Sequence, residues 1–111
     1  MAMVEGDQFS LVLTRTLGTV VVAVSGEVDA GGSEVLRTRL DDVIDDESPL
    51  SLVVDLQDLT FMDSTALGVL VHALKRMRER GGDLTLSAPT PATRKLLDIS
   101  GLDRIFPVSR V

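Results

Sequence analysis

The sequence predicts one α/β domain whose sheet is mixed but mostly parallel, with an N-terminal β-hairpin and helices packed on it. Two apolar stretches near the start, 8–15 and 19–24, alternate or are rich in β-branched residues, which is typical of paired strands. Beyond them, segments with helical spacing alternate with short apolar runs, an order typical of parallel strands joined by helices. The length of 111 residues fits a single domain.

The first half of the chain contains a hairpin, a helix and a buried strand. Leu17-Gly18 forms the tight turn between the two strands of the hairpin. After "GEVD" the spacing becomes helical, with the acidic residues facing water. The apolar stripe of this helix consists of Val35, Leu36, Leu40, Val43 and Ile44. The run "LSLVVDL", 50–56, predicts a parallel strand covered on both faces.

The second half contains a helix, a strand, another helix and an edge strand, predicted at 64–80, 83–88, 90–101 and 104–108. Gly81-Gly82 ends the first of these helices in a left-handed turn. The other helix has Thr90 as its cap, Pro91 at its first position and Gly101 past its end. Pro107 restricts the last strand to an edge, because proline cannot donate to a central ladder. We expect one domain over 1–111, with its core at about 9–108.

The composition excludes several classes of protein. With 44% hydrophobic and 25% charged residues, the chain is not disordered as a whole. It has no run of about 18 apolar residues and no signal-peptide pattern, so we expect a soluble cytoplasmic protein. The lack of cysteine excludes disulfides, thiolate catalysis and cysteine metal sites. A net charge of −6 argues against a dedicated nucleic-acid binder.

Two loops, "SGEVDAGGS" and "TFMDSTA", should lie beyond the carboxyl ends of strands, where open α/β sheets bind ligands and partners. Neither loop has the glycines and lysine of a phosphate-binding loop, and Ser64 is not in a G-x-S-x-G elbow. His72, the only histidine, is about 12 Å from Ser64 along the helix and is expected at the surface or at the boundary of the core. Asp29 and Asp63 alone are too few for a metal site or an acid–base pair.

Residues 63–65, "DST", have a structural and a functional interpretation. In the structural one, Asp63 caps the helix, and Ser64 and Thr65 are residues of its first turn. The helix beyond is apolar almost all round, through Ala66, Leu67, Val69, Leu70, Val71, Ala73 and Leu74. One side should therefore pack on the sheet, while another stays bare beside Ser64 and suits a partner that docks there and modifies the hydroxyl. A helix N-terminus would also favour a phosphate on this serine.

The segment "DLTFMDSTALGVLVHALKRMRERGGDLTLSAPTPATRKLLDISGL" resembles the anti-sigma factor antagonists of the STAS-domain family. The upstream "VSGEVDAGGSEVLRTRL" is similar to the second strand, loop and first helix of the same family. Together with the D-S-[ST]-G-L-G pattern, the resemblance covers about residues 9–108. Ala66 stands where the family commonly has glycine.

The resemblance implies a regulatory binding protein without catalytic activity, cofactor or metal of its own. In this family the serine after the aspartate is phosphorylated by an anti-sigma factor that is an ATP-dependent serine kinase. The unphosphorylated antagonist binds that kinase and frees a sigma factor for transcription, and a phosphatase reverses the modification. Ser64 is then the phosphoacceptor, ATP and magnesium belong to the partner, and neither nucleic acid nor membrane is bound directly. The implied partner-binding residues are Glu27, Asp29, Asp63, Thr65, Ala66, Leu67 and Gly68.

The sequence is also compatible with two other functions to different degrees. The same fold could serve as a non-phosphorylated STAS structural subunit of a transporter or signalling assembly. A small hydrolase or nucleotide-binding module using Ser64 and Asp63 is disfavoured, because a base and a phosphate loop are missing.

Overall fold

A mixed sheet organises the residues that the structure, a computed structural model, describes, namely 3–5 and 8–109. These residues form seven strands, three α-helices and one 3-10 helix. In chain order the elements are β1 (Met3–Glu5), β2 (Phe9–Thr16), β3 (Thr19–Val28), α1 (Ala30–Glu47), β4 (Ser51–Asp55), β5 (Leu59–Met62), α2 (Ser64–Glu79), β6 (Asp83–Ser87), α3 (Pro91–Ser100), η1 (Leu102–Arg104) and β7 (Val108–Ser109). The predicted α/β class is confirmed.

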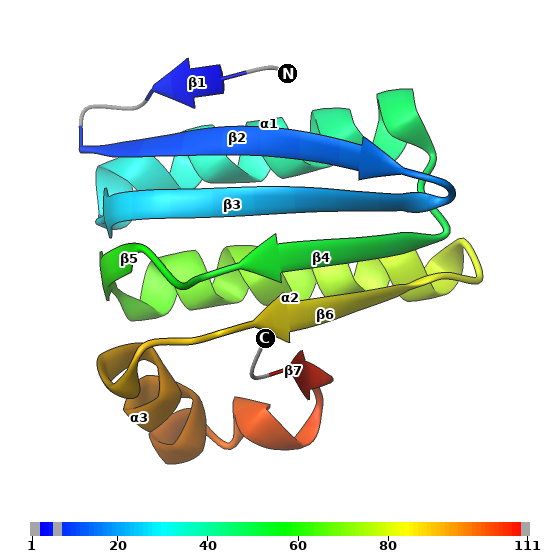
Figure 1. Cartoon of the computed structure of the whole chain (residues 1–111). Coiled ribbons are helices and arrows are strands. Elements are labelled where there is room, and N and C mark those ends of the chain that lie inside the picture. Colours follow the sequence, from blue (N-terminus) through cyan, green and yellow to red (C-terminus); the bar gives the residue numbers. More distant parts are fainter. Residues whose placement is uncertain (1–2, 6–7, 110–111) are drawn as a thin grey trace.

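The sheet has the order β1-β2-β3-β4-β6-β7, and β5 pairs with β3 off this path. The pairs β1–β2 and β2–β3 are antiparallel, whereas the pairs from β3 onward are parallel. Both α1 and α2 lie on one face of the sheet and start at the same end, where the parallel strands finish (Figure 1). The predicted hairpin and parallel strands are therefore confirmed. The strand expected to be covered on both faces, over 50–56, is covered on one face only, because its buried residues alternate and both helices lie on the same side (Figure 1).

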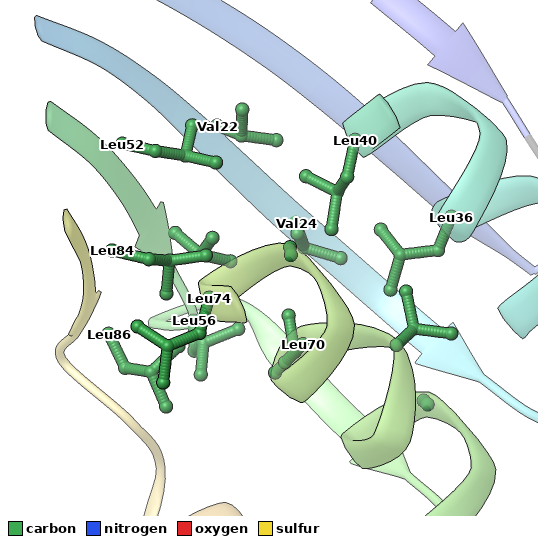
Figure 2. Close-up of a cluster of buried hydrophobic side chains, with 14 of the residues drawn as sticks. Val22, Val24, Leu36, Leu40, Leu52, Leu56, Leu70, Leu74, Leu84 and Leu86 are labelled. Atoms are coloured by element: carbon green, nitrogen blue, oxygen red, sulfur yellow. The ribbon is translucent and has the colours of Figure 1, made fainter. Parts of the chain in front are cut away.

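The core lies between this face of the sheet and the two helices. Buried residues alternate with partly exposed ones along β4 and along β3 as far as Val24, and Leu84 and Leu86 of β6 are buried in the same way, as the pleat of a sheet with one covered face requires. Figure 2 shows these strand side chains pointing toward those of the helices. Burying a leucine or valine side chain contributes about 1.5–3 kcal/mol. The residues labelled in Figure 2 are all at most 2% exposed, namely Val22, Val24, Leu36, Leu40, Leu52, Leu56, Leu70, Leu74, Leu84 and Leu86.

The apolar stripe predicted for α1 is confirmed for Leu36, Leu40, Val43 and Ile44, which are buried, and wrong for Val35, which is 37% exposed. Val35 lies on the outer side because the buried positions of the helix follow Leu36 and Leu40 at intervals of three and four. The small Ser33 takes an inner place instead, and its hydroxyl donates to the Ala30 carbonyl at 2.6 Å. Its burial therefore leaves no unpaired hydroxyl.

The helix ends follow the sequence signals. Gly81 adopts φ 82° after α2, and α3 begins with Thr90 as cap and Pro91 in its first turn. Gly101 ends α3 at φ 76°, so the predicted stops and starts are confirmed.

The predicted strands differ from the observed ones in three places. β1 and β5 were not predicted, and the strand expected over 104–108 is present only at Val108–Ser109. Helical bonds from Ile105 and Phe106 N–H to the Leu102 carbonyl keep this segment out of the sheet. Phe106 anchors it by burying its ring to 4% exposure.

Ion pairs join α1 to the basic C-terminal half of α2. Arg76 donates to Asp41 at 3.0 Å and to Asp45 at 2.6 Å, and the hydrogen bonds to Asp45 and Asp41 raise the pKa of Arg76. His72 is half-buried with its Nε2 3.3 Å from Asp41 Oδ1, in keeping with the boundary position predicted for it. These contacts hold the two helices side by side. No helix among the residues described here has the length and apolar character needed to cross a membrane.

Candidate functional site

The loops after β3 and β5 meet at the carboxyl edge of the sheet. β5 pairs in parallel with the end of β3, with Val28 opposite Met62. The Asp63 N–H donates to the Val28 carbonyl at 3.3 Å. Asp29 follows Val28 and Asp63 follows Met62, so the two aspartates lie on neighbouring strands at one edge. Both predicted segments lie at strand carboxyl ends, as expected, and the unpredicted strand β5 brings them together. They are loops only at Asp29 and Asp63, because 25–28 belong to β3, 60–62 to β5, and the remaining residues to α1 and α2.

Each aspartate caps a helix. Asp63 Oδ1 accepts from the Ala66 N–H at 3.0 Å, and Asp29 Oδ1 accepts from the Gly32 N–H at 2.8 Å. Such a cap is worth about 1 kcal/mol, and an acidic side chain also complements the positive end of the helix dipole. The cap by Asp63 was predicted, whereas the cap by Asp29 was missed. Two helix N-termini therefore open beside each other at this edge.

Ser64 is an accessible hydroxyl on a fixed backbone. It is the first residue of α2, its side chain is exposed, and its hydroxyl has no hydrogen-bond partner among the described residues. Thr65 and Glu27 are also exposed. The His72 ring lies against Asp41, so no imidazole activates Ser64 as a nucleophile. The described part of the chain has no cluster of acidic and histidine side chains that could hold a metal ion.

The bare apolar side predicted for α2 is wrong. Of the seven apolar side chains predicted to surround it, six are at most 8% exposed, and the seventh, Val71, is half-buried. The reason is that α1 packs alongside α2 and covers the flank that the sheet leaves open (Figure 1). The six are Ala66, Leu67, Val69, Leu70, Ala73 and Leu74.

The predicted partner-binding residues are therefore divided by burial. Glu27, Asp29, Thr65 and Gly68 are exposed and Asp63 is half-buried, so these five can be reached by a partner. The Ala66 and Leu67 side chains point into the core at 0% and 2% exposure. The methyl group at position 66 thus packs inside the protein, away from any docking protein.

A groove between β5 and α3 is a part of the site that the sequence analysis missed. It encloses about 200 Å³. Phe61, three residues before Ser64, is 47% exposed on it, although the other two phenylalanines are buried. An aromatic residue next to the "DST" segment in a chain so poor in aromatics was the available signal. The lining residues are Thr60, Phe61, Met62, Ala92, Thr93 and Leu96.

Comparisons with known proteins agree with this architecture. The family model of the STAS domain matches residues 10–111. An anti-sigma F factor antagonist of Paenibacillus polymyxa is 35% identical over 91 residues, which are 82% of this chain and 78% of that protein.

Solved structures extend the similarity to three dimensions. The crystal structure of an anti-sigma factor antagonist from Mycobacterium paratuberculosis superimposes with a TM-score of 0.85 at 31% identity, covering 96% of this chain and 90% of that one. The Bacillus cell fate determinant SpoIIAA in its phosphorylated form gives a TM-score of 0.70 at 26% identity, covering 88% and 89%. Anti-sigma factor antagonists are regulatory proteins and not enzymes, as predicted. The chain belongs to the STAS-domain family of anti-sigma factor antagonists.

Proposed function

We propose that this protein binds an anti-sigma factor that is also a serine kinase, thereby releases a sigma factor for transcription, and is switched off by phosphorylation at Ser64. ATP and magnesium are bound by the kinase, and a separate phosphatase restores the unmodified serine. The exchange takes place in the cytoplasm, where sigma factors meet RNA polymerase, without direct contact of this protein with nucleic acid or membrane.

The observation that carries the proposal is the accessible, unbonded hydroxyl of Ser64 at the start of α2. A kinase needs a hydroxyl that it can reach and that is held in one place. Asp63 supplies the second condition by capping the helix at 3.0 Å from the Ala66 N–H. A relative of the same fold has been solved in a phosphorylated form, which supports the assignment of this class of modification.

The surface around Ser64 suits a protein partner. The exposed carboxylate of Asp29 on the neighbouring strand can meet a basic residue of the kinase, and such charge pairs govern encounter and specificity. The exposed ring of Phe61 can act as an apolar anchor, because aromatic side chains dominate binding at interfaces. The docking surface thus combines an acidic pair, a hydroxyl and an aromatic groove.

Phosphorylation switches binding by acting at this interface. A phosphate adds about −1.5 to −2 charges, and the N-terminus of α2 offsets only about 0.3–1 kcal/mol of the cost. In the complex, the dianion would lose its water beside Asp63, and an unpaired buried charge costs several kcal/mol. Since about 1.4 kcal/mol is tenfold in affinity, a cost of ~3 kcal/mol weakens the complex by about two orders of magnitude.

Incubation with purified anti-sigma factor kinases of the same organism and labelled ATP tests the proposal. We expect label on the wild-type protein and none on Ser64→Ala, which should still bind the kinase. Thr65→Val is the matched control, because it removes the neighbouring hydroxyl and should remain labelled. Label that persists in Ser64→Ala would refute the assignment of Ser64 as the phosphoacceptor. If none of the kinases labels or binds the wild-type protein, the proposed function fails.

A further inference from the structure

Besides the ladder bonds of the parallel β3–β5 pair, three hydrogen bonds tie the segment that carries Ser64 to the segment that carries Asp29. The Gly26 N–H donates to the Asp58 carbonyl at 3.0 Å, and the Asp63 N–H donates to the Val28 carbonyl at 3.3 Å. Between these two backbone bonds, the Thr60 hydroxyl donates to the Gly26 carbonyl at 3.0 Å. Gly26 therefore binds the β5 segment through both of its backbone groups.

The tie at Gly26 lies where β3 changes its geometry. Gly26 lies opposite Leu59 and Glu27 opposite Phe61, so Thr60 is an extra residue and the bulge lies in β5. Gly26 adopts φ 96°. A Cβ at this position would lie 2.3 Å from the Gln8 carbonyl oxygen, which accepts from the Glu27 N–H at 2.9 Å. Only glycine fits there. The conformation of Gly26 and the bulge in β5 together set how the last residues of β3, and hence Asp29, lie against the end of β5.

A bulge interrupts the regular ladder of hydrogen bonds between two strands. The alignment of β3 and β5 therefore depends on the bonds on either side of the bulge. Two of the three ties are backbone bonds that any residue can make. The third is the hydroxyl of Thr60, an exposed residue that faces no demand from the core. If the hydroxyl had no role, valine would fit this exposed strand position equally well.

We infer that Thr60 is a positioning residue of the phosphorylation switch: its hydroxyl holds the bulge of β5 against Gly26 of β3 and so keeps Asp29 in register with Ser64 for a single partner. The inference rests on the proposed function. Thr60 acts through Gly26 and is not itself the acceptor. A partner that must contact both strands at once binds best when they are held in one relative position, since preorganisation reduces the cost of ordering.

Thr60→Val tests the inference, because it replaces the hydroxyl by a methyl group and keeps the β-branched shape. The affinity for the kinase that labels Ser64 should fall about three- to tenfold, the range expected for one net hydrogen bond. Thr60→Ser keeps the donor and should restore wild-type affinity. Thr38→Val is the matched control, because the Thr38 hydroxyl also donates to a backbone carbonyl, that of Glu34 at 3.1 Å, on the exposed side of α1. It should bind like the wild type.

Amide hydrogen exchange of the free proteins separates positioning from direct contact. In Thr60→Val, the Gly26 and Asp63 amides should exchange at least threefold faster than in the wild type, and in Thr38→Val they should not. Weaker binding with unchanged exchange would mean that Thr60 simply touches the partner, and would overturn the inference. Unchanged binding would overturn it as well. The exchange measurement requires no kinase. Unchanged exchange therefore refutes the positioning role of Thr60 even where the proposed function itself fails.

Discussion

Gly68→Ala should make the protein more stable and its complex weaker. Gly68 is the fifth residue of α2 and is exposed, and a Cβ built on it meets no atom within 4 Å. Glycine inside a helix costs about 0.5–1 kcal/mol relative to alanine. With space for the methyl group and helical backbone on both sides, the substitution should raise the free energy of unfolding by about that amount.

A glycine at this position has a physical reason if a partner needs the space. Gly68 lies one turn beyond Ser64 on the same side of the helix, so a kinase that reaches Ser64 also covers position 68. An added methyl group in a close-packed contact costs about 1–3 kcal/mol, which is roughly five- to hundredfold in affinity. The two effects have opposite signs.

Urea denaturation and calorimetric titration with the kinase measure the two effects separately. Because the variant should be the more stable protein, weaker binding could not be attributed to unfolding. An affinity equal to that of the wild type would place Gly68 outside the interface. A loss of stability would contradict the open surroundings described for this position.

The remaining predictions concern charged residues. Asp29→Asn keeps the oxygen that caps α1, so melting should be unchanged while kinase affinity falls; an unchanged affinity would leave Asp29 as a cap only. Asp63→Ala should lose about 0.5–2 kcal/mol of stability in urea, and Asp63→Asn little of it; equal losses would contradict the cap. The hydrogen bonds from Arg15 lower the pKa of Glu47, so the stabilisation by this pair is present above the ordinary glutamate pKa and is lost as pH falls through the lowered one. Arg15→Gln should raise the Glu47 pKa in an NMR titration, and an unmoved titration would show that the pair does not form in solution.

The parts of the fold that could be predicted were those whose burial is visible as periodicity. Leu36, Leu40 and Ile44 of α1 mark a helical face, and the strands of the hairpin alternate. β5 was missed because its burial pattern, inner residues only at Leu59 and Met62, does not alternate. Its four residues are ordered by pairing with β3 and by contact with α3, and neither contact is visible along the chain.

The site could be predicted only where neighbours in sequence are also neighbours in space. Asp63 and Ser64 are adjacent residues, so the cap and the hydroxyl were both foreseen. The groove combines Phe61 with Leu96, which meet only after folding. The apolar content of α2 correctly indicated burial, but periodicity could not show that α1 would cover the second side.

The hydrogen bonds between β3 and the β5 segment also affect when the site forms during folding. Thr60 and Gly26 are 34 residues apart in the chain, whereas the helices rest on contacts within a few residues. Long-range pairing forms slowly, because a long loop must be closed before the contact is gained. We therefore expect the edge bearing Ser64 to be completed late in folding, after the β2–β3 hairpin has formed. Until β5 has paired with β3, the chain would lack the register between Asp29 and Ser64 on which the proposed binding depends.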